Sequence, residues 1–502
     1  MTGSLGRQVA VAAAFMVGSR FAARLIGVFS TLILARLLVP EDFGIIALAA
    51  AAFSIADTAL MTGYGALVLR RETVDRDVFD TAWTMNLIRC VLLAGIIVAT
   101  APLQAWAFGE PRIEEVLLVV AATAAMEGLG SIGVMRQQRE LRFDMLFRLQ
   151  IAQRILSFVF TVALALLLRN YWCLVLGNLA ARLITVPYSY AIAPHRPRLC
   201  LVHWREFLNF SKWIFALNIC SAIEGHAPNL ILGATRGVTE TGRYAVAHQI
   251  SASPISEIAA PIRQPLYAGY AKVKDDPETL RRTFLDSLGL LAAIVLPLSV
   301  GIALVAPEIE RVALGRSWAG TAPLLSLCAL FTLADSFSVF THNAFLLRDR
   351  LRLMVAVFGT TVLFRLPLML LGAWWGGASG MLGALVAVSV VTAVAWHAVT
   401  ARVLGYQLSD AIAELRRPAI AAAIMTAAVM ATRMAMPDAE ATFGAAVAGL
   451  LILCGIGALV HLAAVAAQWW MAGRPPGPEV RIAAVVGSVW RQVRAKRPKR
   501  AA

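Results

Sequence analysis

Two arginines one helical turn apart, Arg20 and Arg24, lie in the middle of an apolar stretch that runs from about residue 8 to residue 38. Gly27 and Thr31 continue the same face of a helix. A charged side chain at the centre of a bilayer costs at least about 2.5–3.5 kcal/mol, so it should face a cavity or a partner. A guanidinium group binds phosphate or carboxylate through two parallel hydrogen bonds. The pair is therefore a candidate for the lining of a cavity at membrane depth.

Other polar side chains recur at helical spacing inside later apolar stretches, and they define a candidate substrate cavity. Asp57, Glu224 and Glu257 lie near the centres of their stretches, where an acid needs a partner. The candidate cavity residues are Arg20, Arg24, Asp57, Asn218, Glu224, His226, His248, Gln249, Glu257 and Arg263. Each of these arginines has a structural alternative, which is pairing with an acid or a helix carbonyl. The same pairing alternative applies to four further arginines. Because they lie away from the span centres, extension toward a membrane surface is a second alternative for them, and they are Arg89, Arg154, Arg182 and Arg365.

Catalytic and cofactor motifs are not evident. Residues 128–133 read GLGSIG, but no strand precedes them, so close helix packing is the expected use of these glycines. No P-loop, H-E-x-x-H or nucleophile elbow occurs, and the six cysteines are scattered without a C-x-x-C pair. We therefore expect neither an enzyme nor a bound cofactor or metal.

Apolar stretches long enough to cross a bilayer recur along the whole chain and must position these side chains. Hydrophobic residues make up 59% of the 502 residues and charged residues only 15%, too few to cover a water-facing surface. We expect an all-α integral membrane protein with 14 spans. They lie at about 10–37, 43–69, 82–103, 115–135, 147–168, 171–192, 208–234, 243–270, 285–306, 321–346, 353–374, 379–402, 416–435 and 443–470. Pro254, Pro261 and Pro265 predict a broken helix in the eighth span.

An internal repeat relates two parts of the chain. Residues 32–49 align without gaps with residues 230–247, so that Gly44 matches Gly242 and Asp42 matches Glu240. Because an even number of spans separates the copies, both have one orientation, which predicts two parallel six-helix lobes with a cavity between them. The expected division is an N-terminal lobe at 1–195, a second lobe at 196–405, two more helices at 406–472 and a basic tail at 473–502.

The stretch ARLLVPEDFG at residues 35–44 resembles the signature of Wzx-type polysaccharide flippases of the multidrug/oligosaccharidyl-lipid/polysaccharide (MOP) exporter superfamily. Residues 65–86 and 242–276 are similar to further blocks of that family. The resemblance implies a 14-helix, two-lobe MOP/MATE-like fold in the bacterial inner membrane. It also implies transfer of polyprenyl-pyrophosphate-linked oligosaccharides by alternating access, with cationic cavity residues on the pyrophosphate or on acidic sugars.

Two other functions remain open at this point. An ion-coupled multidrug antiporter of the same fold would use Asp57 or Glu257 for coupling, whereas a membrane-embedded polysaccharide polymerase or ligase would need a larger outer loop than any found here. For the flippase, the expected partners are a lipid-linked oligosaccharide, membrane lipids and, as candidates, a polysaccharide polymerase and export machinery. Nucleic acid is not expected, because the net charge of +15 comes from residues in short loops and the tail.

The loop charges make a testable prediction about topology. Most of the 45 Lys and Arg residues fall in alternate loops and at the two ends, which places both termini in the cytoplasm. Reporter fusions after Glu110, Arg236, Gly315 and Asp438 should report an external location. Fusions after Arg76, Arg142, Arg205, Asp276 and Arg350 should report an internal one. One inverted pair of adjacent fusions would contradict the 14-span count.

Overall fold

The computed structural model describes residues 26–27, 29–61, 68, 75–140, 142–205, 212–348, 350–436 and 443–473, and across these ranges it contains helices and no strands. Eight of the described helices are long and apolar enough to cross a bilayer, or nine if one bent helix pair counts as a single span. The chain is therefore a multi-pass, all-helical membrane protein. The count of 14 spans stays a prediction.

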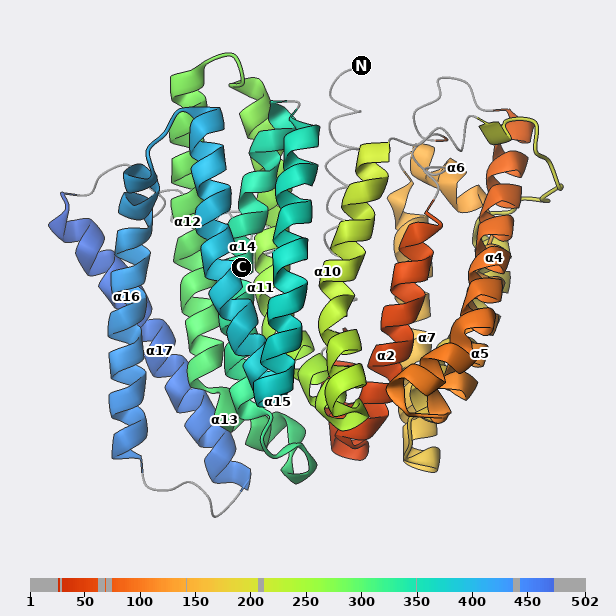
Figure 1. The fold of residues 1–502 in the computed structure, drawn as a ribbon, viewed down its shortest axis with the longest axis horizontal. Coiled ribbons are helices and arrows are strands. Elements are labelled where there is room, and N and C mark those ends of the chain that lie inside the picture. The colour runs from red at the N-terminus through yellow and green to blue at the C-terminus, as the bar shows by residue number, and fades with distance from the viewer. Residues whose placement is uncertain are drawn as a thin grey trace, which may run out of the picture. The chain divides into compact units, whose positions relative to one another are not determined.

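The chain forms two compact units, of which unit 1 gathers the described residues up to Ile250 together with Ala313–Leu324 and Val355–Leu385. Its helices stand side by side in Figure 1, and α5 packs against α2, α4 and α8. The helices are α2 (Pro40–Ala59), α4 (Arg76–Phe108), α5 (Arg112–Gly128), α6 (Gly133–Arg139), α7 (Phe143–Leu168), α8 (Trp172–Ile192) and α10 (Lys212–Arg236). The division into lobes at residues 195 and 405 is not tested by this grouping and stays a prediction.

Unit 2 comprises Ser251–Val312, Leu325–Met354 and the described residues from Val386 onward. In Figure 1, α17 crosses α16 obliquely, and both pack against α12. An aromatic core of Tyr270, Phe284, Phe340 and Tyr406 lies inside this unit. Its helices are α12 (Pro277–Leu304), α13 (Ala306–Ile309), α16 (Leu408–Ala435) and α17 (Phe443–Met471), while α11 (Val238–Lys272), α14 (Ala322–Leu347) and α15 (Leu351–Leu404) have parts in both units. Short η1 (Glu310–Leu314) and η2 (Arg316–Trp318) precede α14.

The span expected at 115–135 is bent in the structure, because α5 and α6 meet at an angle of 59°. The hydroxyl of Ser131, within the break, donates to the carbonyl of Ala193, 2.6 Å away, so the irregular chain is held by the end of α8. The glycines of GLGSIG do pack closely, as expected. A Cβ on Gly128 would lie 2.8 Å from Cβ of Cys90, and one on Gly133 would lie 2.5 Å from the Ala193 carbonyl oxygen.

The expected break at the prolines of the eighth span is wrong, since α11 is one helix from Val238 to Lys272 that includes Pro254, Pro261 and Pro265. A proline removes only its own backbone donor, and the clash of its ring with the preceding turn can be relieved by bending. Helices at membrane depth tolerate this because neighbouring groups satisfy the freed carbonyl.

The expected boundary between the spans at 353–374 and 379–402 is confirmed. Gly376 and Gly377 lie inside α15 with non-helical backbone angles, and φ of Gly377 is 59°. A left-handed residue at this position favours glycine because any Cβ would be strained. The close approach of Gly372 to Gly380 on the other side of the break brings the two arms of α15 together.

The repeat-related glycines Gly44 and Gly242 face each other inside unit 1. A Cβ on Gly44 would lie 1.8 Å from the carbonyl oxygen of Val238, and one on Gly242 would lie 1.7 Å from that of Pro40. Real Cβ atoms do not approach backbone so closely. The first turns of α2 and α11 therefore cross with their backbones in contact, and this contact requires glycine on both sides.

The repeat-related acids also have matching roles. Asp42 accepts a hydrogen bond of 2.9 Å from the backbone N–H of Tyr171, just before α8 begins. Glu240 accepts one of 2.9 Å from the backbone N–H of Ala378, where the second arm of α15 begins. Helix N-termini carry unpaired N–H groups and a positive dipole end, so each carboxylate stabilises the start of a distant helix.

The glycine crossing predicts a stability defect. Gly44→Ala and Gly242→Ala should each lower the melting temperature and the yield of folded protein in detergent, because the new methyl group overlaps backbone that cannot move independently. Gly95→Ala is the matched control, since nothing lies within 4 Å of a Cβ on Gly95. Equal melting temperatures for Gly242→Ala and Gly95→Ala, measured by thermal challenge and size-exclusion chromatography, would contradict the close contact.

Candidate functional site

A polar cluster lies inside unit 1, and its first ion pair joins α2 to α4. Asp57 and Arg89 are in direct contact, and their side chains are 29% and 13% exposed. Arg89 also donates to the side-chain oxygen of Asn86 over 3.3 Å. Asp57 is thus neutralised by an arginine from the neighbouring helix.

A second ion pair joins α5 to α8. The Nη2 atom of Arg182 lies 2.9 Å from Oε2 of Glu127, and its Nη1 atom donates to the Gln153 side chain from α7 over 3.4 Å. Both ion pairs lie within electrostatic range of the Cys90 thiol, which places the four charged groups in one region. Five helices therefore contribute to the polar interior of unit 1.

Two cavities meet at this second pair, since Glu127, Gln153 and Arg182 line both of them. One cavity, of about 260 Å³, is bounded mainly by apolar residues of α2, α5 and α8. The other, of about 300 Å³, lies at the α5–α6 break and is more polar, with Asn86, Arg89, Gln138, Ser131, Thr185 and Ser189 in its wall. Mixed donors and acceptors of this kind suit a hydroxyl-rich ligand, because each ligand hydroxyl both donates and accepts.

A third ion pair joins α10 to the first arm of α15. Arg365 is 3% exposed and contacts Glu224, whose side chain is 20% exposed. Arg365 also has interactions beyond this pair. Because α10 and α15 are far apart in the sequence, this contact fixes their relative position within unit 1.

The remaining predicted site residues are placed less closely together. Asn218 points its amide toward the sulfur of Met61, 4.0 Å away, and His248 packs against the ring of Tyr244 at 5.7 Å. His226 is half-buried on α10, and Gln249 is half-buried on α11. Arg20 and Arg24 lie outside the described residues, as do the side chains of Glu257 and Arg263. Their roles stay predictions.

Of the two alternatives for Arg89, Arg182 and Arg365, pairing is confirmed and extension to a membrane surface is not, because each is paired with an acid of another helix. An arginine pairs with an acid rather than extending to the surface when the acid lies within reach, because the guanidinium and the carboxylate then neutralise each other inside the bundle. Arg154, by contrast, is exposed on α7. The sequence signal for these partners was the presence of Asp57, Glu127 and Glu224 in apolar stretches.

Unit 2 contains an apolar groove between α12, α16 and α17. Its volume is about 690 Å³, and Pro297, Leu298, Met425, Leu453 and His461 are among the residues that line it. Within the described part of the chain, no group of three or more His, Cys, Asp or Glu side chains is arranged to hold a metal ion.

The buried ion pair between α10 and α15 predicts a strong coupling. Arg365→Gln alone should lower the melting temperature markedly, because an unpaired buried charge costs roughly 3–5 kcal/mol. Adding Glu224→Gln should restore most of the loss, since no orphaned charge then remains. Arg281→Gln is the control, because Arg281 forms only a solvent-exposed pair with Glu278 and such pairs contribute about 0.2–1 kcal/mol. Additive losses in the double variant would exclude the pairing.

Comparisons with known proteins agree with the membrane fold and the resemblance of residues 35–44. An uncharacterized membrane protein in the cps region of Klebsiella pneumoniae is 21% identical over 397 residues, covering 77% of this chain and 81% of that protein. The lipopolysaccharide biosynthesis protein WzxC of Escherichia coli K12 is 21% identical over 403 residues, covering 78% of this chain and 81% of that protein.

Among solved structures, the lipid II flippase MurJ in an inward closed conformation superimposes with a TM-score of 0.72 at 15% identity, covering 92% of this chain and all of that one. An inward-facing multidrug transporter of the MATE family of the MOP superfamily gives 0.58 at 16% identity, covering 76% and 94%. These likenesses establish the fold. Residues 33–323 match the model of the family described as "Polysaccharide biosynthesis protein". The chain therefore belongs to the polysaccharide biosynthesis protein family.

Proposed function

We propose that this protein flips polyprenyl-pyrophosphate-linked oligosaccharide repeat units across the bacterial inner membrane for surface polysaccharide synthesis. The mechanism is alternating access between two lobes, with both termini cytoplasmic. Arg20 and Arg24 hold the pyrophosphate through paired hydrogen bonds, and polar residues of the second, seventh and eighth spans contact the sugars. The protein makes and breaks no covalent bond.

Charge balance inside unit 1 is the observation that carries this proposal. Asp57, Glu127 and Glu224 each contact an arginine, so these acids present no net negative charge. A cavity for cationic drugs needs unpaired acids, whereas sugar hydroxyls are well served by neutral pairs of donors and acceptors. The antiporter hypothesis assigned ion coupling to Asp57 or Glu257, and the pairing of Asp57 with Arg89 weakens the first of these two assignments.

The apolar groove of unit 2 supports a substrate with a lipid part. Its wall between α12, α16 and α17 is built almost entirely from aliphatic side chains. In the bilayer, ordinary lipid tails already cover apolar side chains. A polyprenyl chain therefore gains free energy in such a groove only where it packs against the wall better than those tails do. We propose that the groove guides the polyprenyl chain while the charged headgroup crosses.

The function is testable through Arg24. Arg24→Ala should abolish polymer export in a strain that lacks the native copy, because the pyrophosphate loses a charged, bidentate partner. Arg24→Lys should restore it only in part, since lysine keeps the charge but lacks the planar fork. The control is the amount of folded protein in the membrane, which should be equal for all three forms.

Purified protein in liposomes separates the competing functions. Movement of a lipid-linked oligosaccharide between leaflets, without glycosidic bond formation, is the expected result. Bond formation would favour the polymerase or ligase hypothesis, and full export by Arg24→Ala at normal abundance would exclude Arg24 from the site. Export of cationic dyes without movement of the oligosaccharide would favour the antiporter.

A further inference from the structure

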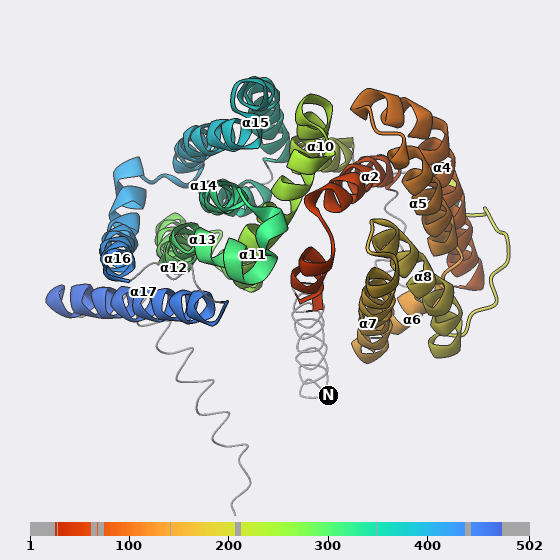
Figure 2. The same cartoon turned by 90° about the horizontal axis from the view of Figure 1, so that it is seen from below.

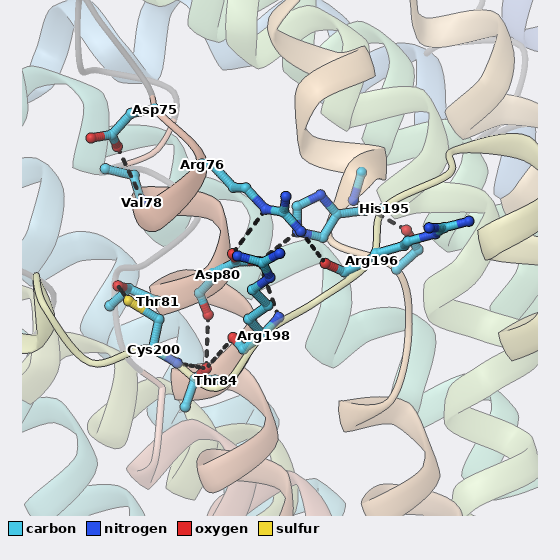
Figure 3. Close-up of polar contacts among 12 residues, drawn as sticks. Asp75, Arg76, Val78, Asp80, Thr81, Thr84, His195, Arg196, Arg198 and Cys200 are labelled. Atoms are coloured by element: carbon cyan, nitrogen blue, oxygen red, sulfur yellow. Dashed lines mark hydrogen bonds and ion pairs between the residues drawn. The ribbon is translucent and has the colours of Figure 1, made fainter.

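The connection that follows α8 in unit 1 is non-helical over residues 194–201, turns at 202–203, and is fastened along the start of α4. We call residues 194–204 the connecting segment. Figure 3 shows the fastening, in which Asp80 of α4 is the centre. Oδ1 of Asp80 lies 2.8 Å from Nε2 of His195 and accepts a hydrogen bond of 3.2 Å from the backbone N–H of Arg198. Asp80 is 1% exposed, so this anchor is buried.

A second anchor lies one helical turn further along α4. The hydroxyl of Thr84 accepts a hydrogen bond of 3.0 Å from the backbone N–H of Cys200 and lies 3.4 Å from the carbonyl of Arg198. Nη2 of Arg76 donates to the carbonyl of Arg196 over 3.2 Å. The backbone of the connecting segment is thus held to α4 at every second residue, namely Arg196, Arg198 and Cys200.

Beside these anchors, the apolar side chains of the connecting segment are exposed. Leu199 is 78% exposed, Leu201 47%, Val202 70% and Trp204 42%. Figures 1 and 2 place the segment at the edge of unit 1, on the side of α4 that faces away from α2.

Arginines surround these exposed apolar side chains. Arg196 and Arg198 are exposed on the segment itself, and the guanidinium of Arg205 lies 5.5 Å from the ring of Trp204. On the adjoining α6, Arg136 lies over the ring of Phe79, 5.0 Å away. Nearby acids are Asp75 and Asp77, which are exposed at the start of α4, and the buried Asp80. The described arginines therefore outnumber the acids.

The length of α4 places this surface relative to the bilayer. With 33 residues, α4 is about 50 Å long, whereas the hydrocarbon core is about 30 Å thick. Divided between the two ends, the excess of about 20 Å places the first turns of α4, which carry Arg76 and Asp80, in the headgroup region. Leucine, valine and tryptophan beside arginine are the composition of segments that insert at this level. The loop charges predict that this is the cytoplasmic side, where the leaflet is anionic.

We propose that the connecting segment is a docking surface for anionic phospholipid headgroups. Leu199, Leu201, Val202 and Trp204 insert among the upper acyl carbons, and Arg196, Arg198 and Arg205 bind the headgroup phosphates. Asp80 and Thr84 act by holding the backbone so that the apolar side chains face lipid. This proposal stands independently of the transported substrate.

The test uses Trp204 as a reporter in the full-length protein, reconstituted in phosphatidylcholine vesicles with a fraction of brominated lipid. The emission of Trp204 is obtained by subtracting the fluorescence of the Trp204→Phe variant from that of the natural protein. Its quenching by brominated phosphatidylglycerol should exceed that by an equal fraction of brominated phosphatidylcholine at least about twofold, because each arginine at the surface attracts anionic lipid. Replacing both arginines, Arg196→Gln with Arg198→Gln, should remove the preference and keep the quenching.

Trp375 supplies the matched control, because it is 83% exposed beside the Gly376–Gly377 break of α15. The emission of Trp375, obtained in the same way from the Trp375→Phe variant, should be quenched equally by brominated phosphatidylglycerol and brominated phosphatidylcholine. Equal quenching of Trp204 by both lipids would overturn the anionic-lipid proposal. Absence of quenching by either lipid would overturn it too, and would favour a protein partner on this surface. Neither result bears on the flippase proposal, since no transport is measured.

Discussion

The cost of an unpaired charge in hydrocarbon is the constraint on which the interior of this protein depends. Each of the three described ion pairs at membrane depth joins two different helices, α2 to α4, α5 to α8 and α10 to α15. Burial strengthens the attraction most in the pair of Arg365, which is 3% exposed, and least in the pair of Glu127, which is 42% exposed. A polar ligand that enters must replace these contacts rather than add charge to them. Neutral, hydroxyl-rich groups can do this at low electrostatic cost.

The ends of the helices obey a similar rule for backbone groups. Asp42 and Glu240 occupy matching positions in the repeat, and each accepts a hydrogen bond from the first turn of a distant helix. The glycines two residues later, Gly44 and Gly242, let the two copies touch through their backbones. A side chain between them would separate the copies and move both carboxylates away from their helices. One short repeated sequence thus determines the crossing and both helix starts.

Hydropathy predicted some described helices closely, such as the span expected at 147–168 and observed as α7 from Phe143 to Leu168. Others differ more, since α2 ends at Ala59 rather than 69 and α12 begins at Pro277 rather than 285. The break at Gly376 was predictable because glycine pairs favour non-helical angles. The α5–α6 bend was not, since it depends on a hydroxyl of Ser131 meeting a carbonyl on α8. The partners of Asp57 and Glu224 were missed for the same reason. Periodicity places a side chain on a face, but only the packing of whole helices decides which face of a neighbour it meets.

Arginine has two different roles in unit 1, and its surroundings decide which one it takes. Within the bundle, Arg89, Arg182 and Arg365 are paired with acids. Beside the connecting segment, the one deeply buried acid, Asp80, is already occupied by His195, Arg76 and a backbone N–H. The exposed guanidinium groups of Arg196 and Arg198 are therefore available to anions from outside the protein. Arginines that are paired with acids inside unit 1 stabilise the helix bundle. Arginines that are exposed at the headgroup level bind anions of the membrane and hold the bundle at a fixed depth.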